Sequence, residues 1–257
     1  MAKKVSIMMM TFNSKIDVEN TLTSIEKQDY PNIEIVIADG GSKDGTLDVI
    51  AQHQKTSKYA IVCVSEKDHG LYDALNKDVK RATGDYLLVG NDQYIDNSAI
   101  TKLVDALEKN DADGAHCDLI YASDTEVKRY WHMGNGRIQN GWLPGHPTLL
   151  LKKEVYEKYG LYKTDYRIAA DYEFMCRILK DGSVKLAYVP EILIRMYYGG
   201  TSTGSSASYW ASIKEGVRAL QSNGYHNAWG ITFLRTCRVF KQFRSLNQVN
   251  GLWESKR

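Results

Sequence analysis

The sequence predicts an α/β fold in which helices cover both faces of a mostly parallel sheet. Four short apolar runs in the N-terminal third are each followed by a polar turn and then by a helical stretch. These runs lack the polar alternation of a half-exposed sheet, so the strands are expected to be buried on both faces, as in a parallel sheet. With 257 residues, the chain is long enough for one large domain.

The four predicted strands cover residues 5–10, 33–38, 60–64 and 86–89. Ligands bind at the carboxyl ends of the strands in a sheet of this kind, so the turns that follow the strands should converge at one edge. These turns are residues 11–14, 39–42, 68–70 and 91–93.

The second half of the chain is less regular. Strands are expected near residues 115–121, 128–133 and 148–151, and a helix near residues 170–180. A further helix is indicated by apolar residues at helical spacing between Trp210 and Leu220, with Asn223-Gly224 as a stop signal. We expect one domain over residues 1–205 and a helical extension over residues 206–257.

Composition narrows the functional classes. Hydrophobic residues make up 43% and charged residues 25% of the chain, which is ordinary for a soluble protein. The four cysteines form no C-x-x-C pair, so neither a zinc site nor a disulfide framework is predicted, and a cytoplasmic location fits. The apolar run near the N-terminus ends after six residues, too short for a signal peptide or a membrane span.

The segment from Asp68 to Gln93 is the most informative part of the sequence. A helix leads into a buried strand that ends in Asn91-Asp92-Gln93, which places the lone carboxylate of Asp92 at the mouth of the sheet. The sequences YDALNK and ATGDYLL before this acidic position resemble family 2 glycosyltransferases. That resemblance covers about residues 4–200, and it implies the GT-A fold and an inverting transfer of sugar from a nucleotide sugar.

The turn ADGGSKDGT places Asp39 at the end of the second strand. Its glycines do not have the G-x-G-x-x-G spacing of a dinucleotide fingerprint, and turn chemistry is the alternative explanation for the carboxylate. The family resemblance implies that Asp39 contacts the nucleotide, and it assigns Thr11 and Asn13 to the nucleobase pocket. Lys67 and Gly70 are placed on the donor side as well.

Asp92 has a specific role if the resemblance holds. A divalent cation, Mn²⁺ or Mg²⁺, would bridge the donor diphosphate to this carboxylate. The usual family motif offers two or three acidic side chains, whereas this chain offers Asp92 alone, so we expect weak metal affinity or an altered metal requirement. The amides of Asn91 and Gln93, or water, would complete the site. Asp96 is expected to cap the following helix.

An inverting transfer also needs a base that takes the proton of the acceptor hydroxyl. In the segment RIAADYEFMCRIL, Asp171 lies in the predicted first turn of a helix, whose positive end favours an ionised carboxylate. Family members carry their base at the acidic position that Asp171 or Glu173 would fill, and we assign it to Asp171. Simple helix capping is the alternative.

The acceptor side is assigned to Trp142 and His146, because an aromatic ring beside polar groups suits a sugar. Trp142 is equally well explained as a core residue. The segment YYGGTS, with Gly200 and Ser202, resembles the family loop that folds over the donor diphosphate. A surface loop without function is the alternative.

The C-terminal segment is basic. Residues 226–257 carry six Lys or Arg against Glu254, which leaves the remainder of the chain at about −3 for a net charge of +2. On a helical wheel, Phe233, Cys237 and Phe240 share a face opposite Arg235 and Arg238. This pattern is compatible with a helix on an anionic membrane surface, while packing on the domain or on a homodimer partner is the alternative. Nucleic acid is not an expected partner.

The sequence therefore predicts a hexosyltransferase-type enzyme similar to those that build bacterial surface polysaccharides such as O-antigen. It would transfer one sugar from a nucleoside diphosphate donor, UDP in the first instance, to a saccharide or lipid-linked saccharide, in the cytoplasm or at the inner face of the membrane. The two alternatives are a sugar nucleotidyltransferase and a catalytically silent subunit that binds sugar nucleotides or glycans. The first strand is followed by TFNSK, without the glycine-rich loop expected of a nucleotidyltransferase.

Overall fold

The computed structural model describes residues 2–197, 206–243 and 249 as a mixed α/β structure with a curled nine-stranded sheet. The strand order is β3-β2-β1-β4-β8-β6-β9-β5, and β7 pairs with β6 at the side of this path. The strands are β1 (Val5–Thr11), β2 (Ile33–Asp39), β3 (Ala60–Ser65), β4 (Tyr86–Val89), β5 (Gln93–Tyr94), β6 (Gly114–Ala122), β7 (Val127–Trp131), β8 (Leu150–Lys152) and β9 (Leu186–Tyr197).

Eight α-helices accompany these strands in the described part of the chain. They are α1 (Lys15–Glu26), α2 (Thr46–Thr56), α3 (Leu71–Arg81), α4 (Ala99–Lys109), α5 (Lys153–Tyr159), α6 (Ala170–Ile178), α7 (Ser206–Ser222) and α8 (Ala228–Lys241). Two short 3-10 turns, η1 (Ile138–Asn140) and η2 (His146–Thr148), lie between β7 and β8.

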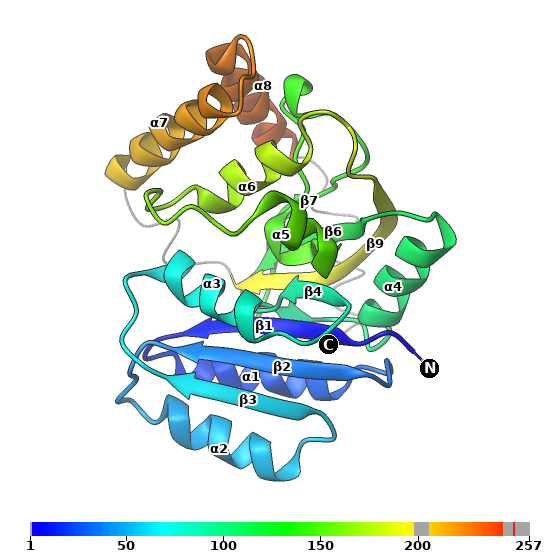
Figure 1. Ribbon diagram of the computed structural model, residues 1–257, viewed down its shortest axis with the longest axis vertical. Coiled ribbons are helices and arrows are strands. Elements are labelled where there is room, and N and C mark those ends of the chain that lie inside the picture. Colours follow the sequence, from blue (N-terminus) through cyan, green and yellow to red (C-terminus); the bar gives the residue numbers. More distant parts are fainter. Residues whose placement is uncertain (1, 198–205, 244–248, 250–257) are drawn as a thin grey trace.

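The first four predicted strands are confirmed, and β3, β2, β1 and β4 are mutually parallel. The expected burial on both faces is wrong for β3, which lies at the edge of the sheet and leaves Val62 47% exposed. Thr11 lies opposite Asp39, and Asp39 lies opposite Ser65, so these strands end at a common edge. The arrowheads of β1, β2 and β3 in Figure 1 point to the same side of the molecule. The predicted convergence of the turns follows from this register.

The second half of the sheet contains antiparallel pairs and a strand that the sequence did not predict. Strand β8 runs antiparallel to both β4 and β6, which makes the sheet mixed. Strand β9 pairs in parallel with β6 and was not predicted, because Pro190-Glu191 interrupts its apolar pattern and proline within a run normally argues against a strand. The strand predicted at residues 148–151 is observed at Leu150–Lys152, because η2 includes Thr148.

Two hydrophobic clusters cover the two faces of the sheet. On β1, Ile7 belongs to the cluster formed with α1, α2 and α4, whereas Met8 belongs to the cluster formed with α3, α5, α6 and α7. Both side chains are 0% exposed. Successive residues of a strand point to opposite faces, so a sheet buried on both sides requires the continuous apolar run that the sequence shows.

The C-terminal helices pack on the domain through α6. Val217 of α7 and Ile231 of α8 belong to the same hydrophobic cluster as Phe174 of α6. Figure 1 shows α7 and α8 at the end of the molecule away from β3 and α2. Among the described residues, none of the helices combines the length and apolar character needed to cross a membrane. The boundary at residue 205 stays a prediction.

Helix α8 directs Arg235 and Arg238 toward the domain and exposes Phe233 and Phe240 to solvent. The guanidinium of Arg235 lies 4.3 Å from the ring centroid of Tyr172, and Arg238 Nε donates to the carbonyl of Asn140 at 2.9 Å. Phe233 and Phe240 are each 67% exposed. The two predicted faces are therefore present, with the aromatic face exposed.

Candidate active site

The loops after β1 and β2 are joined side by side at the carboxyl edge of the sheet. Asn13 adopts the left-handed conformation with φ 48°, which its short polar side chain tolerates. Its backbone N–H donates to Ser42 Oγ at 2.8 Å, and its Oδ1 accepts from the N–H of Lys43 at 2.9 Å. The carbonyl of Thr11 accepts from Gly40 N at 2.9 Å. The first two predicted donor-binding segments therefore form one surface.

The carboxylate of Asp39 is buried and bonded within its own loop. Its Oδ2 accepts from the N–H groups of Gly41 and Ser42, both at 3.0 Å, and from Ser65 Oγ at 2.5 Å. Ser42 Oγ donates to Oδ1 at 2.5 Å. Burial raises the pKa of Asp39, but these hydrogen bonds outweigh burial and hold the pKa below its usual range. The ionised carboxylate thus fixes the loop, and its contact with a nucleotide stays a prediction.

The third loop touches the second at Gly40. A Cβ on Gly40 would lie 2.8 Å from Asp68 Oδ2, so the loops approach more closely than a side chain at position 40 permits. Gly70 has φ 116°, a conformation that favours glycine, and its N–H donates to Asp68 Oδ1 at 2.9 Å. The side chain of Lys67 is exposed beside this loop. An exposed cation therefore lies beside the loop at the predicted donor edge.

The amides that flank Asp92 are occupied by protein groups. Asn91 Oδ1 accepts from the N–H of Met10 at 3.2 Å, and Asn91 Nδ2 donates to the carbonyl of Met10 at 2.6 Å. Gln93 Oε1 accepts from Arg195 Nη1 at 3.0 Å. Asn91 therefore joins the end of β4 to β1, and Gln93 is held by a guanidinium. The donor-binding role of Asn91 stays a prediction.

Asp92 itself is a half-buried carboxylate without a hydrogen-bond donor in the described part of the chain. Burial, together with the negative charge of Asp17, raises the pKa of Asp92 to about 7. Among the described residues, Asp92 has no cationic partner that would stabilise its negative charge. Strongly shifted carboxyl groups of this kind in a cleft are candidates for function.

Asp171 lies in the first turn of α6, as predicted. Tyr72 Oη donates to Asp171 Oδ1 at 3.1 Å and to the carbonyl of Ile168 at 2.6 Å, while Asp171 Oδ2 has no donor among the described residues. Glu173, the other acidic candidate, is 0% exposed and is paired with Lys163 at 2.7 Å and Arg177 at 2.9 Å. Of the two, only Asp171 therefore retains an oxygen that can accept a proton.

Helix α7 positions the start of α6 through Glu215, which the sequence analysis did not identify. Glu215 Oε1 accepts from the N–H of Arg167 at 2.9 Å, and Oε2 accepts from those of Ile168 at 2.8 Å and Ala169 at 2.9 Å. A carboxylate at a helix N-terminus satisfies backbone donors that have no partner within the helix. No local sequence pattern signals this contact, because Glu215 is far from α6 along the chain.

We expect Glu215→Gln to displace Asp171 as well as to weaken the fold. The change removes the charge from three hydrogen bonds, and charged hydrogen bonds each contribute about 1.5–3 kcal/mol. The free energy of unfolding should fall by ~2 kcal/mol in urea denaturation. At a temperature where the variant is folded, kcat should fall while KM for the donor stays near the parent value. An unchanged kcat would show that Glu215 supports the fold alone.

The two predicted acceptor residues occupy different places. His146 Nε2 is bonded to Tyr162 Oη at 2.8 Å, and the charge of Asp171 reaches its ring. Burial lowers the pKa of His146 and Asp171 raises it, with a net shift downward, so the imidazole is neutral at pH 7. Trp142 is 6% exposed and its indole donates to the carbonyl of Met133 at 3.0 Å.

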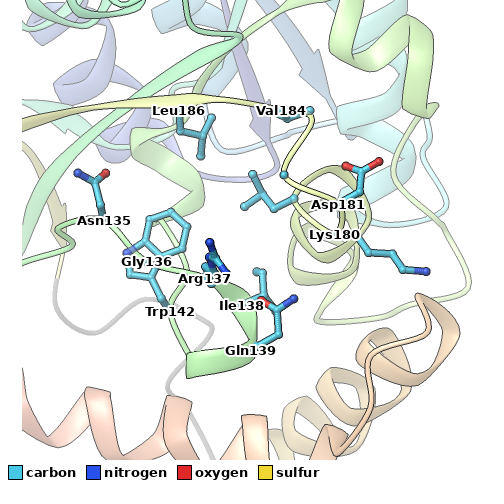
Figure 2. Close-up of a pocket in the computed structure, with 12 residues that line it drawn as sticks. Asn135, Gly136, Arg137, Ile138, Gln139, Trp142, Lys180, Asp181, Val184 and Leu186 are labelled. Carbon is cyan, nitrogen blue, oxygen red and sulfur yellow. The ribbon is translucent and has the colours of Figure 1, made fainter.

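Trp142 lines a hollow of about 380 Å³ that contains none of the other predicted site residues. Figure 2 shows Trp142 beside Gly136 and Arg137, with Asp181 and Leu186 across the hollow. The surroundings of Trp142 fit a core residue better than a residue that contacts an acceptor sugar. His146, in contrast, lies within the electrostatic reach of the predicted base.

The charges of Asp92 and Asp171 both act on Tyr121. Burial raises the pKa of this tyrosine; the guanidinium of Arg129 lowers it, and the charges of both Asp92 and Asp171 raise it further. Both carboxylates therefore lie within electrostatic reach of Tyr121. Gly200 and Ser202, assigned to the loop over the diphosphate, lie outside the described residues.

A family model described as "Glycosyl transferase family 2" matches residues 6–184. The chain is 27% identical over 202 residues to a PGL/p-HBAD biosynthesis glycosyltransferase of Mycobacterium bovis, covering 77% of this chain and 78% of that protein. It is 26% identical to a dolichyl N-acetyl-alpha-D-glucosaminyl phosphate 3-beta-D-2,3-diacetamido-2,3-dideoxy-beta-D-glucuronosyltransferase of Methanococcus voltae, covering 87% of this chain and 75% of that one.

Solved structures share the fold. S. aureus TarS 1-349 in complex with UDP-GlcNAc superposes with a TM-score of 0.70 at 15% identity, covering 94% of this chain and 74% of that one. The mannosyltransferase PcManGT of Pyrobaculum calidifontis, in complex with GDP-Man and Mn²⁺, superposes with a TM-score of 0.62 at 16% identity, covering 100% of this chain and 85% of that one. The predicted GT-A architecture is confirmed by this likeness.

Proposed function

Because the chain belongs to glycosyltransferase family 2, we propose that it transfers one sugar from a nucleoside diphosphate donor to an acceptor hydroxyl with inversion at the anomeric carbon. The observation that carries the proposal is a pair of carboxylates whose charges both act on Tyr121. Asp92 and Asp171 each keep an oxygen without a donor in the described part of the chain, and they come from separate segments, the turn after β4 and the first turn of α6.

Asp171 is the proposed base. Its Oδ2 accepts the proton of the acceptor hydroxyl as the hydroxyl oxygen attacks the anomeric carbon, and the bond from that carbon to the diphosphate breaks on the opposite face. The carboxylate lies in the first turn of α6. Tyr72 donates a hydrogen bond to Oδ1, which fixes the orientation of the carboxylate and leaves Oδ2 to accept the proton. His146 is neutral beside the base and is suited to orienting the acceptor through a hydrogen bond.

The surroundings of Asp92 fit a divalent cation. Its carboxylate is half-buried, has a raised pKa and lacks a positive partner among the described residues, which are properties that a bound cation would compensate. The described residues hold no cluster of three or more His, Cys, Asp or Glu suited to a metal. Asp92 would thus be the main protein ligand, with diphosphate and water as the others, as is common for Mg²⁺. When bound, Mn²⁺ or Mg²⁺ stabilises the charge on the leaving diphosphate.

We assign the donor side to the joined loops that carry Thr11, Asn13 and Asp39, with Lys67 and Gly70 beside them. UDP is the proposed nucleotide, supported by the UDP and UDP-GlcNAc complexes of the TarS neighbours, although PcManGT was solved with GDP-Man. A thermal-shift screen of nucleotide sugars, each with and without Mn²⁺, tests the assignment. A uridine donor should stabilise the protein more with metal than without, and a shift only with GDP sugars would overturn the choice of UDP.

We place the reaction in the synthesis of bacterial surface glycans such as O-antigen, on a saccharide or lipid-linked saccharide. Relatives named for PGL biosynthesis and for a dolichyl phosphate acceptor support this assignment. The proposed location is the cytoplasm, with the exposed aromatic residues of α8 at the inner face of the membrane. Because the acidic motif is reduced to Asp92, donor hydrolysis with Mn²⁺ or Mg²⁺ separates this enzyme from a silent binding subunit, which would show no turnover.

A further inference from the structure

A groove between α7 and α8 combines one charged residue with an apolar wall. Its volume is about 250 Å³. Arg235 and hydroxyl-bearing side chains line the groove together with apolar side chains. The lining residues are Ser212, Ile213, Gly216, Thr232, Arg235, Thr236, Val239 and Phe240. A ligand that fills such a groove has an anionic group and an apolar chain.

Arg235 is a half-buried cation that forms no ion pair with a carboxylate in the described part of the chain, unlike Arg177 and Arg218. Arg177 is paired with Glu173, and Arg218 with Asp165. The guanidinium of Arg235 instead lies 4.3 Å from the ring centroid of Tyr172. An arginine cannot lose its charge in a protein, and its planar group matches the geometry of phosphate. The groove therefore favours an anion beside Tyr172.

The apolar part of the groove continues into an exposed aromatic stripe. Phe240 lines the groove and is 67% exposed, and Trp229 and Phe233 on the same side of α8 are 61% and 67% exposed. Helix α8 contains no acidic residue and carries Arg235, Arg238 and Lys241. An exposed aromatic stripe on a helix without acidic residues, with Arg235 and Arg238 on the opposite face, has the chemistry of a helix whose aromatic side enters a lipid interface.

We propose that this groove binds the lipid phosphate of a membrane-bound acceptor. The phosphate pairs with Arg235, and the first part of the lipid chain lies along Ile213, Val239 and Phe240, continuous with the bilayer at the aromatic stripe. The acceptor role rests on the proposed function. Arg235 lies over the ring of Tyr172, which directly follows Asp171 in α6. A phosphate bound to Arg235 therefore holds the lipid end of the acceptor next to the helix that carries the base.

The test is calorimetric titration of the full chain with three probes. Farnesyl phosphate carries both the chain and the phosphate, farnesol carries the chain alone, and inorganic phosphate carries the anion alone. Farnesyl phosphate should bind more tightly than either of the others. Arg235→Gln should weaken farnesyl phosphate binding by at least about tenfold, or 1.4 kcal/mol. Arg235→Lys should retain part of the affinity, because it keeps the charge.

Two further variants separate loss of the site from loss of the fold. Arg238→Gln is the matched control, since it removes the same charge from the same helix outside the groove, and it should leave farnesyl phosphate affinity unchanged. A Cβ on Gly216 would lie 3.5 Å from Arg235 Nη1 and 3.6 Å from Tyr172 Cε1, which are ordinary contacts. Gly216→Ala should therefore fold normally, whereas Gly216→Leu should fill the groove and reduce binding.

Equal binding of farnesol and farnesyl phosphate would overturn the phosphate site. Equal binding of inorganic phosphate and farnesyl phosphate would overturn the chain site. Equal weakening by Arg235→Gln and Arg238→Gln would show a general charge effect and would also overturn the proposal. Titration with the nucleotide donor is independent of these results, so a negative outcome here with intact donor binding leaves the proposed transferase function standing.

Discussion

Asp171→Asn is expected to reduce sugar transfer by about 10²–10⁴-fold, the range that a positioned general base contributes. The amide keeps the size of the side chain and its hydrogen bond with Tyr72, but it cannot take the proton of the acceptor hydroxyl. The donor contacts other residues, so its affinity should not change. Turnover with the best donor from the screen measures kcat, and titration with the same donor measures affinity. Retained turnover would remove Asp171 from the base role.

Glu173→Gln is the matched control, because it also replaces a carboxylate by an amide, two residues further along α6. Glu173 is 0% exposed and bonded to Lys163, Arg177 and Asn223. Removing its charge leaves the half-buried Arg177 and Lys163 without their carboxylate, and breaking a buried ion pair costs up to about 3–5 kcal/mol. We expect this variant to lose stability in urea denaturation while the folded fraction keeps its kcat. The reverse outcome, an inactive and stable Glu173→Gln, would move the base to position 173.

Asp92→Ala is expected to weaken donor binding in the presence of Mn²⁺ by at least about tenfold, or 1.4 kcal/mol. Donor binding without metal should not weaken, because the carboxylate acts through the cation. Titration of the donor with and without Mn²⁺ measures both values. Asp96→Asn serves as the control, since Asp96 accepts from Ser98 N at 2.9 Å and pairs with Lys102 at 3.0 Å at the start of α4. Equal metal dependence in Asp92→Ala and the parent would refute the metal assignment.

The raised pKa of Asp92 also sets a pH dependence. Metal binding requires the ionised carboxylate, so Mn²⁺-dependent donor affinity should rise with pH and level off above about 7. Stability should behave in the opposite way. The folded pKa exceeds the ordinary value of 3.8, so the folded state holds the proton more tightly and stability falls as pH rises from about 4 to about 7. Asp92→Asn should therefore be more stable than the parent at pH 8 by up to ~4 kcal/mol, because the pKa rises from 3.8 to about 7 and each pKa unit corresponds to 1.36 kcal/mol.

The sequence predicted the parallel half of the sheet well because each strand there is a continuous apolar run that ends in a polar turn. It did not predict β9, since Pro190 interrupts the strand and the pairing with β6 is irregular there. The hydrogen bonds of Asn91 to Met10 and of Gln93 to Arg195 could not be predicted either. Such contacts join segments far apart in the chain, and no local spacing encodes them.

The same limit applies to the site residues. Asp92 and Asp171 were recognisable because each follows a clear element boundary, and Tyr121 links them only in three dimensions. Asp78 had no local signal either: it is 0% exposed on α3, burial raises its pKa to about 8, and its Oδ2 accepts from Ala38 N at 3.1 Å next to Asp39. Trp142 was assigned from residue type alone, and its buried position beside Met133 reflects packing.

The central claim is that Asp39, Asp92 and Asp171 surround one cleft for a sugar diphosphate. It is tested most directly by locating Mn²⁺ from its anomalous scattering in crystals grown with UDP. The account predicts one strong peak about 2 Å from a carboxylate oxygen of Asp92, as expected for a small divalent cation, with the nucleotide against the loop of Asp39. A nucleotide bound away from that loop, or manganese bound away from Asp92, would contradict the account.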